Sequence, residues 1–150
     1  MRRGIEVDAR GRFWLVIRKK ESRNMPSKSL SDLDPRLRDA FEQLKSRYEA
    51  TYPDTKVLVT CTYRSPEEQA ALYAQGRTSP GRIVTMCDGK THLSKHNCYP
   101  AKAFDVVISV CGRGTWSERF YADLGALAAE IGVKWGGTFK SFKDLPHFEI

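Results

Sequence analysis

The amino-acid sequence predicts an α+β domain in which helices pack on a small antiparallel sheet. In two stretches, 35–50 and 117–131, the apolar residues have helical spacing. These alternate with apolar stretches of high β-propensity at 56–63 and 101–110. The 150 residues suffice for one domain with a proper core and are too few for two of ordinary size. A hydrophobic fraction of 41% beside 29% charged residues is typical of an ordinary globular protein.

Residues 1–24 differ from the rest, and we interpret them as an N-terminal extension to a main domain at 25–150. Apolar stretches at 5–7 and 13–17 flank a short polar segment, which predicts a β-hairpin. Met25 offers an alternative translation start. The apolar run is shorter than the roughly 7–15 residues of a signal-peptide core or the roughly 20 of a membrane span. We therefore expect a protein made in the cytoplasm, without a leader or a transmembrane segment.

Helix boundaries are marked by local signals. Asp34-Pro35 opens the first helix with proline at its first position, and apolar residues then recur at helical spacing at Leu37, Phe41, Leu44 and Tyr48. After the strand at 56–63, the sequence Ser65-Pro66-Glu67-Glu68 predicts a capping box and a helix to about Gln75.

The second half of the chain begins with a long loop at 76–100, a kind of segment that is usually functional or disordered. A buried strand at 101–110 and an amphipathic helix at 117–131, ended by Gly132, follow. The segments 135–137 and 147–150 predict a closing pair of strands.

Charge and cysteine content limit the choice of partner. The net charge of +7 favours anionic partners such as nucleic acid, teichoic acid, lipopolysaccharide or phospholipid headgroups. The basic residues are scattered, so specific nucleic-acid binding is not expected. None of the four cysteines forms a C-x-x-C pair, and we expect four reduced, mostly buried thiols. Cys98, two residues after His96, is an alternative soft metal ligand.

Two histidines and one aspartate fit the ligand count of a catalytic zinc site: His96, Asp105 and His147. Asp105 lies within an apolar strand, where a carboxylate needs a partner, either a metal ion or a cation such as Lys102. In the final strand His147 and Glu149 face one side and Phe148 the other.

Two further charged residues fit the chemistry of hydrolysis. Asp144, three residues before His147 with Pro146 between them, is a candidate general base, or else an ordinary turn residue. Arg64, at a strand–helix junction, could bind a substrate carboxylate or stabilise an oxyanion; otherwise it is a surface cation.

Five motifs in this order resemble the zinc peptidases of peptidoglycan, which include VanY-type D,D-carboxypeptidases and phage L-alanyl-D-glutamate endopeptidases. The resemblance spans about residues 26–150, and its motifs are Thr62-Tyr63-Arg64-Ser65-Pro66-Glu67-Glu68-Gln69, Ser94-Lys95-His96-Asn97, Ala103-Phe104-Asp105, Trp135-Gly136-Gly137 and Asp144-Leu145-Pro146-His147-Phe148-Glu149. The eight residues between His96 and Asp105 exceed the family's usual interval by two, and an even insertion keeps Asp105 on the same face of its strand. Pro100 indicates that the extra residues bulge before the strand begins.

The resemblance implies a hedgehog/D,D-peptidase fold with one zinc ion held by His96, Asp105 and His147. It makes Asp144 the general base and Arg64 the group that stabilises the oxyanion, with Tyr63, Ser94 and Trp135 along the substrate cleft.

The activity implied is hydrolysis of the L-Ala–D-Glu bond of peptidoglycan by a monomeric phage endolysin, released to the cell wall by a holin. The alternatives are a D-Ala-releasing D,D-carboxypeptidase on the same site and a non-catalytic, zinc-containing wall-binding module.

Overall fold

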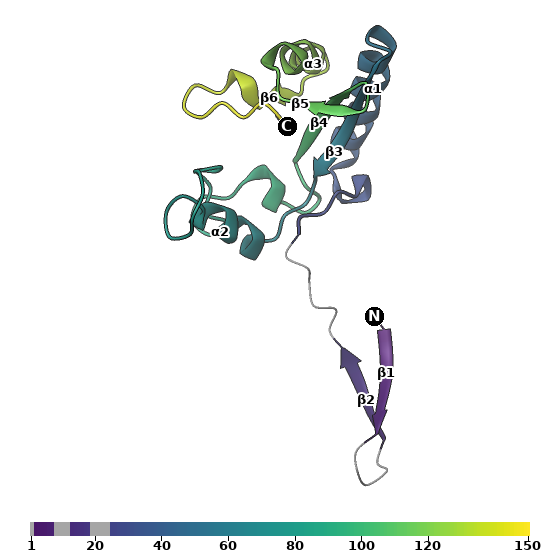
Figure 1. Ribbon diagram of the computed structural model, residues 1–150, viewed down its shortest axis with the longest axis vertical. Coiled ribbons are helices and arrows are strands. Elements are labelled where there is room, and N and C mark those ends of the chain that lie inside the picture. Colours follow the sequence, from purple (N-terminus) through teal and green to yellow (C-terminus); the bar gives the residue numbers. More distant parts are fainter. Residues whose placement is uncertain (1, 8–12, 19–24) are drawn as a thin grey trace.

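The computed structural model describes residues 2–7, 13–18 and 25–150 (Figure 1). Its helices are α1 (Pro35–Thr51), α2 (Pro66–Ala74) and α3 (Glu118–Glu130), with short 3₁₀ turns at Leu30–Asp32, Lys95–Asn97 and Gly136–Thr138. Its strands are β1 (Arg2–Val7), β2 (Phe13–Arg18), β3 (Thr55–Cys61), β4 (Ala103–Val110), β5 (Arg113–Thr115), β6 (Lys134–Trp135) and β7 (His147–Glu149). No helix of the described residues is long and apolar enough to cross a membrane.

The main sheet is antiparallel throughout, in the order β3-β4-β7-β6, with β5 also paired to β4. The predicted α+β class, a small antiparallel sheet packed with helices, is therefore confirmed. β1 and β2 form a separate antiparallel pair, as the apolar stretches predicted. The turn expected between them lies outside the described residues, and the division of the chain at residue 24 stays a prediction.

The residues predicted to cap the first two helices do so in the structure. Asp34 accepts a hydrogen bond from the Arg36 backbone N–H at the start of α1. Ser65 and Glu68 form the complete capping box of α2, each side chain bonding to the other residue's backbone N–H.

Two elements differ from the sequence prediction. The strand expected at 135–137 ends at Trp135, and the two glycines form a 3₁₀ turn instead. β5 had no apolar pattern to predict it; it returns from β4 through Cys111 and Gly112, both at positive φ. All four cysteines are free as expected, but only Cys61 is buried, so the expectation of mostly buried thiols is wrong.

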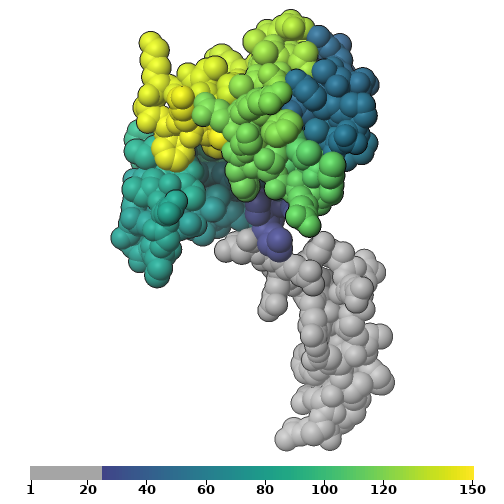
Figure 2. Space-filling view, turned by 45° about the horizontal axis from the view of Figure 1, so that its top comes forward, coloured from purple at the N-terminus to yellow at the C-terminus, as the bar shows by residue number. Residues whose placement is uncertain are grey.

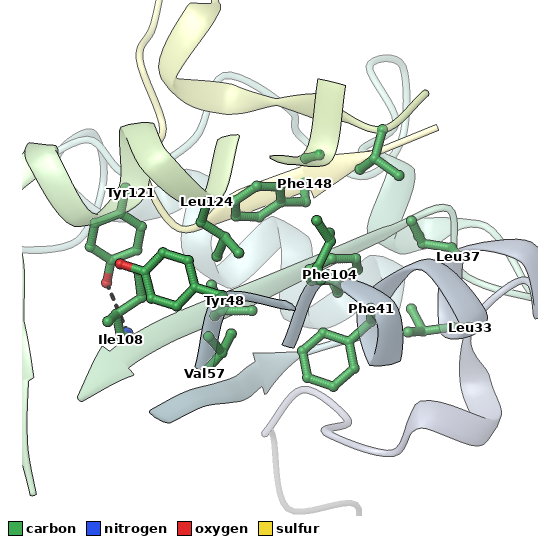
Figure 3. Packing of buried hydrophobic residues seen from close by; sticks show 14 of the residues in the cluster. Leu33, Leu37, Phe41, Tyr48, Val57, Phe104, Ile108, Tyr121, Leu124 and Phe148 are labelled. Carbon is green, nitrogen blue, oxygen red and sulfur yellow. Dashed lines mark hydrogen bonds between the residues drawn. The ribbon is translucent and has the colours of Figure 1, made fainter. Parts of the chain in front are cut away.

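The hydrophobic core lies between the sheet and the two long helices (Figure 3). α1 and α3 contribute apolar faces, and β3, β4 and β7 contribute the inward side chains Val57, Phe104, Ile108 and Phe148. The rings of Phe104 and Phe148 stack at 5.4 Å, and Phe41 packs edge-on against Phe104 at 5.3 Å. Such aromatic burial dominates core energetics, so this cluster anchors β4 and β7 side by side.

A partly buried carboxylate, that of Glu49, connects α1 to β3. Glu49 accepts hydrogen bonds from the Lys45 ammonium, from the Lys56 ammonium at 3.1 Å and from the Val57 backbone N–H at 2.9 Å. Burial alone would raise the pKa of Glu49, but these donors outweigh it and lower the pKa to about 2.

We predict that Glu49→Gln lowers the free energy of unfolding by about 1.5–3 kcal/mol at neutral pH, the range for hydrogen bonds to charged groups. Because the folded-state pKa lies below the ordinary value near 4.5, this stabilisation is present above that value and is lost as the pH falls towards 2. Urea unfolding between pH 7 and pH 2.5 checks it, with the exposed Glu42→Gln as control. A difference independent of pH would contradict it.

Candidate metal and substrate site

The pairing of β4 with β7 places two candidate residues opposite each other. Asp105 is the direct cross-strand partner of His147, and Phe104 is the partner of Phe148. Since side chains alternate across a strand, the two phenylalanines in the core force Asp105 and His147 onto the other face. The sequence prediction that Phe148 and His147 point to opposite sides is confirmed.

His96 reaches the same point from the loop before β4. It lies in the 3₁₀ turn Lys95–Asn97, where Ser94 and Asn97 form a capping box. The Asn97 amide also donates to the Arg64 carbonyl at 2.9 Å, and the Arg64 N–H donates to the His96 carbonyl at 3.0 Å. These bonds fix the loop against the end of β3. β4 begins at Ala103, after Pro100, and the placement of the two extra residues before the strand stays a prediction.

Three donor atoms meet at this point. Asp105 Oδ1 lies 3.1 Å from His96 Nε2 and 3.1 Å from His147 Nδ1, and the two nitrogens are 3.3 Å apart. Tetrahedral zinc with bonds of about 2.0–2.2 Å needs its ligand atoms separated by roughly 3.3–3.5 Å. The donor set therefore fits a zinc-sized ion with at most small adjustments.

Each imidazole is oriented through its other nitrogen. His96 Nδ1 lies 2.6 Å from the Thr62 carbonyl, and His147 Nε2 lies 3.0 Å from Glu149 Oε2. Because an imidazole N–H donates to such acceptors, His96 Nε2 and His147 Nδ1 are the nitrogens left to face Asp105. Without a metal they donate hydrogen bonds to the Asp105 carboxylate, and loss of those protons would free the same two nitrogens to ligate a metal ion.

Charge is concentrated around Asp105. Burial acts to raise its pKa, but the His96 charge and hydrogen bonds from both imidazoles outweigh burial and hold the pKa well below its usual range. The hydrogen bond from His147 lowers the pKa of Glu149. Both carboxylates are therefore ionised at neutral pH, the form in which they bind cations and orient imidazoles.

Cys61 is a second candidate ligand on the same face. It is the cross-strand partner of Asp105 on β3, and Cys61, His96 and Asp105 offer donor atoms within 4.8 Å of one another. However, its sulfur lies 3.6 Å from His96 Nδ1, the nitrogen directed to the Thr62 carbonyl rather than the one facing Asp105. The geometry favours His147 over Cys61 as the third donor. Cys98, the soft ligand considered from sequence, is not part of this group.

Arg64 is held beside the donor triad. Its side chain is only 11% exposed, which rules out the surface-cation alternative. One terminal nitrogen donates to Gln69 Oε1 at 2.8 Å, and the other lies 3.4 Å from Cys61 Sγ and 3.5 Å from Asp105 Oδ2. Its guanidinium therefore presents positive charge next to the place where a metal would lie.

Asp144 lines the same cleft from the segment before β7. Burial, followed by the negative charge of Asp105, raises the pKa of Asp144, which makes it a stronger base than an exposed aspartate. Its backbone packs tightly on Gly136, where an added Cβ would lie 2.4 Å from the Asp144 carbonyl oxygen. Gly136 thus permits the close approach that brings Asp144 and His147 together.

The cleft has a volume of about 560 Å³ and lies between the segment around α2 and the C-terminal segment. Figure 2 shows these two segments, teal and yellow, next to each other. Ser94 lines the cleft together with the charged residues described above. Its apolar walls come from Leu72, Val84, Met86, Leu93, Phe139 and Phe142.

Tyr63 and Trp135, the other predicted substrate contacts, are not among the described residues that line this cleft. The Trp135 ring packs so closely on Gly125 and Gly137 that a Cβ at either glycine would overlap it, and its Nε1–H donates to the Leu145 carbonyl at 2.8 Å. This position supports the segment leading to His147. Tyr63 packs edge-on against the exposed Tyr99 at 5.5 Å. A substrate role for either residue stays a prediction.

Sequence reasoning did not assign roles to Glu149, Gln69 or Cys61. Strand alternation placed Glu149 on the face of His147 and could have revealed its contact with the imidazole. The approach of Cys61 to Asp105 depends on an irregularity in β3 between Val59 and Cys61, which has no sequence signal of its own.

A triad of donor atoms that could hold a metal ion, beside a carboxylate and a guanidinium in one cleft, is the arrangement expected of a metallopeptidase. Residues 88–150 match the profile of a peptidase M15 family described as D-alanyl-D-alanine carboxypeptidase. The peptidoglycan L-alanyl-D-glutamate endopeptidase CwlK of Bacillus subtilis (strain 168) is 33% identical over 129 residues, covering 80% of this chain and 74% of the relative. This chain belongs to the M15 family of peptidoglycan peptidases, which confirms the resemblance seen in the sequence.

The fold has a relative among solved structures. The crystal structure of the L-Ala D-Glu endopeptidase ChiX of Serratia marcescens superposes with a TM-score of 0.58 at 25% identity. The match covers 87% of this chain and 93% of the other.

We predict that Glu149→Ala weakens metal binding about 10–100-fold, because groups that orient a ligating histidine typically contribute that much. Competition with a chromophoric chelator measures the affinity, and the exposed Glu67→Ala serves as control. An affinity equal to that of the wild type would show that Glu149 does not orient a ligand.

Proposed function

We propose that this protein is a zinc-dependent endopeptidase that hydrolyses the L-Ala–D-Glu bond of the peptidoglycan stem peptide. The observation that carries the proposal is the meeting of His96 Nε2, Asp105 Oδ1 and His147 Nδ1 within 3.3 Å, in a cleft that also holds Asp144 and Arg64. The bond is suggested by the two named relatives, both of which are L-alanyl-D-glutamate endopeptidases.

In this proposal His96, Asp105 and His147 hold the ion, and Glu149 and the Thr62 carbonyl orient the imidazoles. When bound, zinc supplies Lewis-acid catalysis, which polarises a carbonyl and lowers the pKa of water. Asp144 accepts a proton from the attacking water and transfers it to the leaving amine. Its raised pKa suits both steps, since the carboxylate must take up the proton and then release it.

Arg64 stabilises the negative charge that develops on the scissile carbonyl oxygen. Its guanidinium is already largely buried and is hydrogen-bonded to Gln69, so little reorganisation is needed when that charge appears.

A D,D-carboxypeptidase that releases terminal D-Ala is the second candidate, because the matching family profile carries that description. Both reactions use the same triad, base and cation, and they differ only in where the stem peptide lies along the cleft.

The biological setting is also a proposal. We infer a monomeric endolysin that is made in the host cytoplasm and that a holin releases to the wall. Expression in a susceptible host with and without a holin tests this, since lysis should require both. Lysis without the holin would refute the need for a release partner.

The first test is mass spectrometry of purified peptidoglycan after digestion, with and without a zinc chelator. We expect fragments with a new amino terminus on D-Glu, lost on chelation and restored by zinc. Free D-Ala as the product would establish the carboxypeptidase instead. Products that persist in the chelator would contradict metal dependence.

We predict that Asp144→Asn reduces turnover about 10²–10⁴-fold, the usual contribution of a general base, while metal content stays at the wild-type level. Turnover is followed by release of new amino groups from peptidoglycan, and metal content by elemental analysis. The exposed Asp39→Asn is the matched control. Unchanged turnover would remove Asp144 from the mechanism and assign the general base to another residue.

A further inference from the structure

Gln69 is a polar side chain with no exposed surface, and its amide is fully engaged. It lies in α2, where its Oε1 accepts from Arg64 Nη1 at 2.8 Å. Its Nε2 donates to Thr85 Oγ1 at 3.0 Å and to the Cys87 carbonyl at 2.8 Å. One amide thus connects the proposed catalytic cation with the loop that follows α2.

That loop forms one wall of the cleft, and it is packed around Gln69. Thr85 and Cys87 both line the cleft. At Gly89, which has a φ of +76°, an added Cβ would lie 2.8 Å from the Cβ of Gln69. The loop therefore contacts both the amide and the aliphatic part of this side chain.

We propose that Gln69 is the positioning residue that holds Arg64 and the 85–89 wall of the cleft as one unit. This inference rests on the proposed function, in which Arg64 stabilises the developing oxyanion. Only a side chain with both an acceptor and donors can serve the two partners, since Arg64 has only N–H groups to offer and Cys87 offers a carbonyl. Arg64 touches Asp105 from the other side, so a shift of Arg64 alters the charge beside the triad.

The test compares Gln69→Met, similar in size but without the amide, with Gln43→Met on the exposed face of α1. We expect Gln69→Met to reduce kcat about 10–100-fold, because small misplacements of a catalytic group have effects of that size. Metal stoichiometry and secondary structure should stay those of the wild type. Backbone amides of residues 85–89 should exchange faster with solvent in Gln69→Met but not in Gln43→Met, a readout that needs no activity.

A double-mutant cycle separates positioning of Arg64 from general support of the fold. If Gln69 acts through Arg64, adding Gln69→Met to Arg64→Ala should lower kcat less than twofold further. A full additional loss in the double variant, or a wild-type kcat in Gln69→Met, would overturn the inference. If Gln69→Met does not fold, Gln69→Leu carries the same cycle, since its side chain likewise lacks the amide that accepts from Arg64.

Digestion of peptidoglycan by the wild-type protein distinguishes a failure of the Gln69 inference from a failure of the proposed function. An inactive wild-type protein would refute the proposed function, whereas an active wild type with an equally active Gln69→Met would refute only the role of Gln69.

Discussion

The pairing of β4 with β7 is the constraint on which the site depends. Phe104 and Phe148 stack in the core, and this fixes a register in which Asp105 and His147 are direct partners on the other face. A slip of one residue would turn both metal-binding candidates into the core and both phenylalanines out of it. The hydrophobic core and the site are therefore specified by the same few residues.

Around this pair lie charged groups whose burial would be unfavourable if each were unpaired. Two imidazoles and a guanidinium lie next to Asp105. On its other side, each of these three groups is hydrogen-bonded to a carbonyl, a carboxylate or an amide. Such a shell limits the movement of the ligating atoms before any ion or substrate arrives. The same shell extends through Gln69 to the cleft wall, so rigidity of the centre and shape of the cleft are linked.

Local signals made much of this predictable. The Asp34 and Ser65 caps, the helical spacing in α1 and α3 and the alternation at His147–Glu149 depend on near neighbours in the chain, and the structure has them where the sequence indicated. What could not be predicted depends on tertiary packing: the burial of Gln69, the approach of Cys61 to Asp105 and the enclosure of Trp135 by Gly125 and Gly137. The short β5 also lacked a signal, because it follows a turn and carries no apolar pattern.

We propose that His96, Asp105 and His147, rather than Cys61, hold the ion. X-ray absorption at the zinc edge of the zinc-loaded wild-type protein measures the ligand atoms directly. We predict only nitrogen and oxygen neighbours of the zinc at about 2.0–2.2 Å, two of them imidazole nitrogens. A sulfur neighbour at about 2.3 Å would contradict it and place Cys61 on the metal.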